Sequence, residues 1–224
     1  MIIDHVGAVF FPRESAFRIV GRIAFPLYAW CVVLGAVYTH DVKKYALRLF
    51  ITGIFSQPFF MAALKHSWNE LNIFFTLLLG LLGITGIRLK KSGSHIWCPI
   101  LAVLAACIVY VDYSWQGVLF ILLLYSARKS RAVLTSVMIA FCLFWGTSGG
   151  SMAYFFGIPV PVHIPWLPQA ASLLGVLRRI QFWALLALPL MLFPIQVSVK
   201  FPRWMAYAAY PLHLFLIFLV QRFV

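Results

Sequence analysis

The residues with the clearest capacity for chemistry stand at the beginning of the sequence, where Asp4 and His5 interrupt an otherwise apolar run. Burying either side chain in hydrocarbon is costly unless it is paired, so ionisable residues at membrane depth are candidates for function. Successive residues of a helix point about 100° apart, so Asp4 and His5 each need a partner of their own. Arg22 is the nearest cation for Asp4 outside the first loop, which holds Arg13 and Arg18, and we expect Asp112 or Tyr113 to orient His5.

The elements that position these side chains must be membrane-spanning helices. The chain is 63% hydrophobic and 10% charged, whereas a soluble domain is about half apolar and about a quarter charged. Its 224 residues divide into about eight or nine spans of roughly 20 residues, joined by short loops. We therefore predict an all-α, polytopic transmembrane bundle that forms a single domain over residues 1–224.

The excess of positive charge fits this class of protein. The net charge is +13, but the basic residues stand between the apolar runs, as they do in the loops of membrane proteins. We therefore expect no nucleic-acid partner. The cysteines lie inside apolar segments without the spacing of metal ligands, so we expect small core residues and no metal site at Cys31, Cys98, Cys107 and Cys142.

Apolar runs between the charged clusters give the expected spans. Residues 1–12 are too few to cross about 30 Å of hydrocarbon at about 1.5 Å per residue, which predicts a short first helix or a natural start upstream of Met1. A further span ends near residue 63, and the others are expected at 19–39, 71–87, 96–111, 115–125, 132–145, 171–195 and 203–222. The uncharged stretch 146–168, rich in Gly and Pro, predicts a re-entrant or interfacial loop.

Charge asymmetry gives an orientation. If nine segments alternate, the basic clusters at 43–48, 88–91 and 128–131 share one side, and the positive-inside rule makes that side and the N-terminus cytoplasmic. Polar residues then converge in the opposite leaflet: Arg22, Gln57, Asn72, Asp112, Tyr113, Arg178, Gln181 and His213. Snorkelling to the interface is an alternative reading for Arg178 and Arg179.

Several motifs carry a resemblance to a known family. The N-terminal run Ile3-Asp4-His5-Val6-Gly7 and the later Gly21-Arg22-Ile23-Ala24-Phe25-Pro26 resemble the signature of the TraX family, pilin acetylase-like integral membrane proteins. The likeness continues in order through Thr39-His40, Leu71-Asn72-Ile73-Phe74-Phe75, Asp112-Tyr113 and Tyr210-Pro211-Leu212-His213. There are two departures: the chain lacks the usual short lead-in to Asp4, and Ser56-Gln57-Pro58 replaces a run that carries an acid.

The resemblance implies acetyl transfer from cytoplasmic acetyl-CoA to an acceptor on or across a bacterial inner membrane. The acceptor would be a pilin N-terminal amine or a glycan. Related membrane acyltransferases use an intramembrane histidine, and by position that role passes to His5. The other matched polar residues are Asp4, Arg22, Asn72, Asp112 and His213.

The residues themselves suit acyl transfer, because an amine or hydroxyl acceptor must lose a proton as it attacks a thioester and a neutral histidine is the usual base. We expect His5 to act as base or transient acyl carrier, with Asp4 in the same catalytic group and Asp112 as orienter. Arg22 or Asn72 would stabilise the oxyanion. Tyr113, Tyr210 and His213 would line the pocket.

Lys43, Lys44 and Arg48 would hold the CoA phosphates, although the positive-inside rule explains the same cations without a ligand. A proton-coupled small-molecule transporter is the alternative function, since it would also need buried Asp, His and Arg. The paired, matching halves typical of such transporters are absent from the sequence. A non-catalytic scaffold subunit would not need so many converging polar groups.

Overall fold

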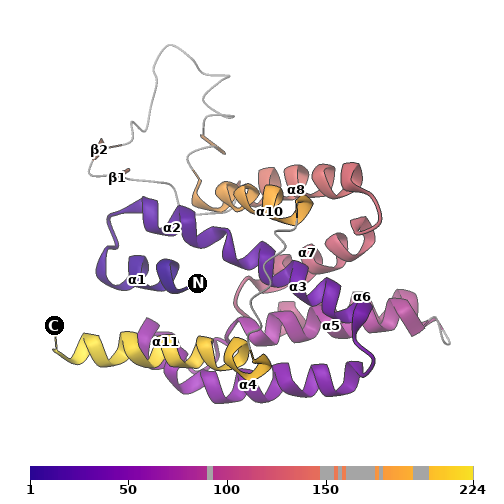
Figure 1. The fold of residues 1–224 in the computed structure, drawn as a ribbon, viewed down its shortest axis with the longest axis horizontal. Helices are drawn as coiled ribbons and strands as arrows, with labels where there is room; N and C mark the ends of the chain where they lie inside the picture. Colours follow the sequence, from indigo (N-terminus) through magenta and orange to yellow (C-terminus); the bar gives the residue numbers. More distant parts are fainter. Residues whose placement is uncertain are drawn as a thin grey trace, which may run out of the picture. The chain divides into compact units, whose positions relative to one another are not determined.

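The computed structural model describes residues 1–89, 93–146, 154–155, 158–159, 175–176, 179–193 and 202–223, and it confirms the all-α class (Figure 1). The helices are α1 (Ile2–Phe10), α2 (Ser15–Arg22), α3 (Ala24–Tyr38), α4 (Val42–Leu64), α5 (Ile73–Leu89), α6 (Ser94–Ile108), α7 (Ser114–Ala127), α8 (Arg131–Gly146), the 3-10 helix η1 (Ile180–Ala187), α10 (Leu188–Leu192) and α11 (Arg203–Phe223). A two-residue antiparallel pair, β1 (Tyr154–Phe155) and β2 (Ile158–Pro159), accompanies them.

The chain divides into two compact units. The first comprises Met1–Leu27 and Lys129–Ile195, and therefore holds α1, α2, α8, η1 and α10. The second comprises Tyr28–Arg128 and Gln196–Val224, and holds most of α3 together with α4 to α7 and α11. The single domain expected from the sequence stays a prediction.

Helix lengths identify a membrane protein that crosses the bilayer more than once. In the described part of the chain, three helical segments are long and apolar enough to span it: Ser15–Tyr38, Val42–Leu64 and Trp204–Phe223. The shorter apolar helices α5 to α8 match the expected spans to within a few residues. Helix α1 has nine residues and is about 14 Å long, so the first helix is short, as predicted.

Helices α1 and α2 form a closely packed hairpin in the first unit (Figure 1). Glycines permit the close approach: a Cβ added at Gly7 would lie 2.4 Å from the Phe17 Cβ, and one at Gly21 would lie 2.3 Å from the Asp4 Cβ. The helix after this hairpin is interrupted at Ile23. Pro26 has no N–H to donate to the Arg22 carbonyl, which explains why α2 ends and α3 begins there.

Helix α5 is the centre of the second unit, because it packs against α4, α6 and α7. Its glycines recur every third residue, and the Cβ atoms they lack would meet side chains of α7 and α6. At Gly80 an added Cβ would lie 2.6 Å from Ile121, and at Gly86 it would lie 2.0 Å from the Cys98 Cβ. Small residues at such crossings allow helices to pack closely in a membrane, where van der Waals contact drives their association.

The eighth expected span differs from the prediction. A continuous α-helix was expected over 171–195, whereas residues 180–187 form the 3-10 helix η1 and Leu188–Leu192 is α-helical. Pro189 contributes, since it has no N–H for the Leu185 carbonyl. Most of the predicted interfacial loop 146–168 lies outside the described residues, as does Arg178.

The loop between α4 and α5 contains an exposed acid, Glu70, whose carboxylate is contacted by two nitrogens of the same loop. Glu70 Oε2 accepts from the Ser67 N–H at 2.9 Å and lies 2.6 Å from His66 Nδ1. The Ser67 N–H, and next the His66 ring, lower the pKa of Glu70 below its usual value. Both contacts therefore favour the ionised carboxylate.

We expect this loop to lose local stability in acid. Because the pKa of Glu70 is lowered by folding, its stabilisation is complete above the ordinary Glu pKa of about 4.3 and disappears as the pH falls through the lower value in the folded loop. Amide hydrogen exchange over residues 65–70, corrected for intrinsic rates, should show protection that falls below about pH 4. The variant Glu70→Gln should lack this step, and an unchanged step in that variant would assign it to another group.

A buried ion pair and a second polar cluster as the candidate functional site

The candidate site of the first unit is a buried ion pair between Asp4 and Arg22, here called the N-terminal ion pair. Arg22 Nη2 donates to Asp4 Oδ2 at 2.6 Å and to Oδ1 at 2.8 Å. The two side chains are only 5% and 8% exposed. Arg22 is thus the partner of Asp4, which confirms that pairing.

Two neighbours extend the N-terminal ion pair. Arg18 Nη1 lies 3.4 Å from Asp4 Oδ1 and donates to the Asp4 carbonyl at 3.3 Å, and its side chain is 30% exposed. Gln181 of η1 accepts from Arg22 Nη1 at 3.3 Å. One guanidinium therefore connects α1, α2 and η1.

Asp4 holds the guanidinium of Arg22 in place, because both of its carboxylate oxygens accept hydrogen bonds from Arg22. The place of Asp4 in the catalytic group stays a prediction.

His5 is buried beside Asp4 in sequence, with 5% of its surface exposed. The backbone N–H of His5 donates to the Met1 carbonyl at 2.9 Å, so the His5 backbone is fixed within the first turn of α1. His5 belongs to the first unit and its predicted orienters Asp112 and Tyr113 to the second. That pairing stays a prediction.

The close contact at Gly21 gives a prediction about the N-terminal ion pair. In the variant Gly21→Ala, the new methyl would lie 2.5 Å from Asp4 Oδ1 and 2.7 Å from the Asp4 Cα, so the backbone of α1 must shift. Overpacking of this kind costs about 1 to 3 kcal/mol. Thermal unfolding in detergent should show this loss. Gly175→Ala is the matched control, because no described residue lies within 4 Å of its added Cβ. Equal melting curves for the two variants would contradict the close contact.

The second polar cluster begins at Asn72, which has no exposed surface and precedes α5. Its Nδ2 donates to the Gly53 carbonyl at 2.7 Å and to Gln57 Oε1 at 2.9 Å, while Oδ1 accepts from the Phe74 N–H at 3.0 Å. The last bond caps the N-terminus of α5. Asn72 therefore uses both amide hydrogens to join α4 to α5. To donate to an oxyanion, its side chain would first have to break these hydrogen bonds.

Gln57 occupies the position at which the TraX resemblance leads one to expect an acid. Its Oε1 accepts from the Asn72 N–H at 3.1 Å, and its Nε2 donates to the Glu70 carbonyl at 2.6 Å. A carboxylate could not make the second bond, because it has no hydrogen to donate. The amide at this position is thus suited to its structural partners.

A short bridge places Asp112 next to the start of α5. The Leu71 N–H donates to the Tyr110 carbonyl and the Asp112 N–H to the Leu71 carbonyl, both at 2.8 Å, and the Thr76 hydroxyl donates to the Asp112 carbonyl. The following residues Tyr113 and Ser114 have φ angles of 64° and 50°. Left-handed conformations at two successive non-glycine residues are strained, and such strain often accompanies a functional site.

Two residues of α11 complete this cluster. The Tyr210 ring meets the Phe74 ring edge to face at 5.1 Å and the His213 ring at 5.2 Å. His213 Nδ1 lies 2.8 Å from the Ala209 carbonyl and must carry the hydrogen, because a carbonyl only accepts.

The second unit therefore brings five predicted site residues together, here called the α5 cluster: Asn72, Asp112, Tyr113, Tyr210 and His213. Beside it is a cavity of about 210 Å³, lined by Tyr210, Tyr28, Tyr45 and Tyr207 among others. Tyr210 was expected to line a pocket, whereas Tyr28, Tyr45 and Tyr207 were not anticipated from the sequence, because they come from separate helices.

The predicted phosphate-binding cations lie at the beginning of α4. Asp41 caps this helix by accepting from the Lys44 N–H at 3.0 Å, a bond that lowers the pKa of Asp41, and it also pairs with Lys44 Nζ at 3.3 Å. Lys43 and Arg48 are exposed. Within the described ranges, no three His, Cys, Asp or Glu side chains are grouped so that they could hold a metal ion.

These features define a polytopic helical membrane protein with ionisable residues buried among its helices. The family model described as TraX protein matches residues 1–221, so the chain belongs to the TraX family. It is also 28% identical over 150 residues to the probable fimbrial assembly protein FimC, serogroup H1, of Dichelobacter nodosus. That match covers 59% of this chain and 61% of the relative. No solved structure matches the chain.

Proposed function

We propose that this protein is a membrane acetyltransferase that moves the acetyl group of acetyl-CoA to an amine or hydroxyl acceptor. The observation that carries the proposal is the burial of His5, which follows Asp4 of the N-terminal ion pair in the sequence, in a chain of the TraX family. Burying an imidazole and an ion pair in an apolar helix costs free energy, and a catalytic role would explain why the protein keeps these groups there.

His5 is the proposed base. The acceptor nitrogen or oxygen attacks the thioester carbonyl, its proton passes to the neutral imidazole, and CoA departs as the thiol after receiving that proton. A transient acetyl-imidazole would be the alternative use of the same side chain. Arg22, held by Asp4 and Gln181, supplies a fixed positive charge suited to stabilising the tetrahedral oxyanion. Asp112 is retained as the proposed orienter of the imidazole.

The donor is proposed to bind from the cytoplasm of a bacterial cell with the protein in the inner membrane. Lys43, Lys44 and Arg48 are the proposed phosphate ligands, because all three are exposed in the first two turns of α4. The predicted cytoplasmic N-terminus follows from the same charge asymmetry. The name of the relative, a probable fimbrial assembly protein, favours a pilus subunit as acceptor, with a glycan as the second candidate.

The test is acetyl transfer by the purified protein in proteoliposomes. Labelled acetyl-CoA is supplied with a peptide that bears a free N-terminal amine, and both the acetylated peptide and the released CoA thiol are measured. We expect saturable CoA release that depends on the peptide. An absence of both products with peptide and sugar acceptors alike would refute the proposal, and solute flux without acetyl-CoA would support the transporter instead.

A further inference from the structure

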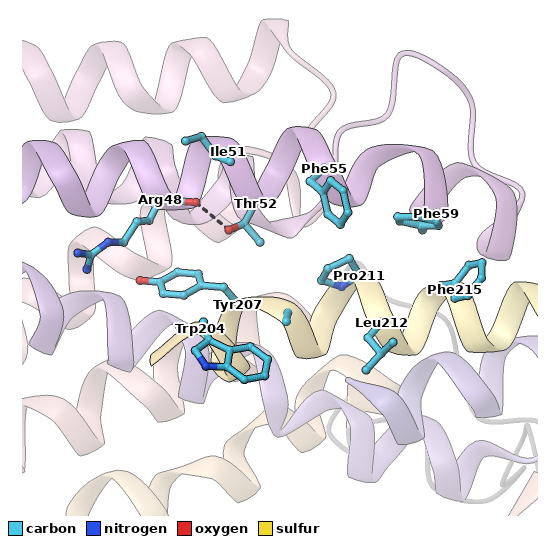
Figure 2. Close-up of a pocket in the computed structure, with 11 residues that line it drawn as sticks. Arg48, Ile51, Thr52, Phe55, Phe59, Trp204, Tyr207, Pro211, Leu212 and Phe215 are labelled. Atoms are coloured by element: carbon cyan, nitrogen blue, oxygen red, sulfur yellow. Dashed lines mark hydrogen bonds between the residues drawn. The ribbon is translucent and has the colours of Figure 1, made fainter. Parts of the chain in front are cut away.

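Helices α4 and α11 enclose a long apolar groove in the second unit, here called the α4–α11 groove (Figure 2). It has a volume of about 880 Å³. Phe59 and Phe215 meet edge to face at 5.6 Å near one end, and Arg48 and Trp204 stand at the other. Between these ends the lining is almost wholly apolar, and Phe55 remains 64% exposed.

The length and level of the groove match one leaflet of a bilayer. From Arg48 to Phe59 the helix advances about 16 Å, which is close to half of the roughly 30 Å hydrocarbon thickness. Trp204 begins the spanning segment Trp204–Phe223, and tryptophan prefers the headgroup level. On α11 the groove therefore begins at the interfacial end, marked by Trp204, and ends at Phe215, near the middle of the spanning segment Trp204–Phe223.

The positive charge of Arg48, at one end of the groove, favours the binding of an anion. Arg48 has no carboxylate within ion-pair distance among the residues that the structure places. The whole sequence contains 18 Lys and Arg but only five Asp and Glu, so the protein cannot supply acids for most of its cations. A phosphate is the anion available at this depth in a membrane, and guanidinium binds it in a bidentate manner.

We propose that the α4–α11 groove is a binding site for one anionic phospholipid. Its phosphate is bound by Arg48, and one acyl chain lies along Phe55 and Leu212 toward Phe59. The shared chemistry of a phosphate joined to an apolar chain also exists in acyl-CoA. Exposed apolar side chains of α4, Ile51 and Phe55, line the groove, whereas Lys43 and Lys44 do not, so lipid is the occupant to which the geometry points. Arg48 is also among the cations proposed for the CoA phosphates, so competition between lipid and acetyl-CoA distinguishes the two ligands.

The experiment is native mass spectrometry of the detergent-purified chain after incubation with phosphatidylglycerol or phosphatidylcholine of identical acyl chains. We expect one retained phosphatidylglycerol per chain and a clear preference over phosphatidylcholine. Arg48→Gln should lower this preference about fivefold, the contribution of one basic residue near an anionic lipid surface. Ala208→Trp, which fills the groove, should abolish retention of both lipids.

Matched controls separate this site from general effects. Arg131→Gln removes an exposed cation outside the groove, and Leu104→Trp enlarges a side chain that is 51% exposed on α6. Both control variants should retain phosphatidylglycerol as the unaltered chain does. The melting temperature of every variant is measured, and only variants that melt at the same temperature as the unaltered chain are compared. An Arg48→Gln variant with undiminished preference would overturn the proposal. So would stoichiometric displacement of the lipid by acetyl-CoA, which would assign the groove to the donor.

Discussion

Replacing Arg22 with methionine is expected to destabilise the first unit by about 3 to 5 kcal/mol, because it removes the main partner of a buried carboxylate. Arg22 contributes both short bonds to Asp4, at 2.6 and 2.8 Å, and its own side chain is 8% exposed. Methionine keeps much of the volume, so the loss arises from the uncompensated charge rather than from a cavity. Thermal and denaturant unfolding in detergent would measure it.

Arg18→Met is the matched control for this prediction. Arg18 approaches the same carboxylate, but at 3.4 Å and with a side chain that is 30% exposed, so solvent screening should limit its effect to about 1 kcal/mol or less. The double variant Asp4→Leu with Arg22→Met should recover most of the lost stability, since removing both charges leaves nothing unpaired. Equal losses for Arg18→Met and Arg22→Met would show that the N-terminal ion pair is not the dominant interaction.

The positions of the helices could be predicted because apolar runs and charged clusters alternate clearly. Helix α6 was expected at 96–111 and extends over Ser94–Ile108, and the short first helix follows directly from residue count. The 3-10 segment η1 could not be predicted in this way. It packs against α2 and α8, so its form depends on contacts distant in sequence rather than on its own composition.

The partner of Asp4 was predictable because the sequence offers few acids and one nearby cation outside the first loop. The structural role of Asn72 was not, since its bonds reach Gly53 and Gln57, 19 and 15 residues away. Nor does any sequence signal mark the left-handed backbone of Tyr113, a conformation that favours glycine. The apolar pattern of the sequence therefore predicts where polar residues lie along the helices. Which of these residues already donate their hydrogens to structural hydrogen bonds depends on tertiary contacts.

Substituting His5 is therefore the most direct test of the proposed reaction. The groups of Asp4 and Asn72 are largely committed to structural hydrogen bonds. We expect His5→Ala to lower acetyl transfer by about 10² to 10⁴-fold, the usual contribution of a general base, while melting temperature and membrane content change little. Added imidazole, entering the space left by the side chain, should restore part of the rate.

His66→Ala is the matched control for His5→Ala, because His66 is exposed in the loop between α4 and α5, paired with Glu70. It should leave the transfer rate unchanged. Saturation curves for acetyl-CoA distinguish chemistry from binding: loss of a base lowers kcat and leaves KM nearly constant, whereas collapse of the first unit would lower the amount of folded protein. Full activity in His5→Ala would exclude this histidine as base and as acyl carrier. The N-terminal ion pair would then be a structural feature of the α1–α2 hairpin. The chemistry would be assigned to His213 of the α5 cluster, the other histidine that is buried among the described residues.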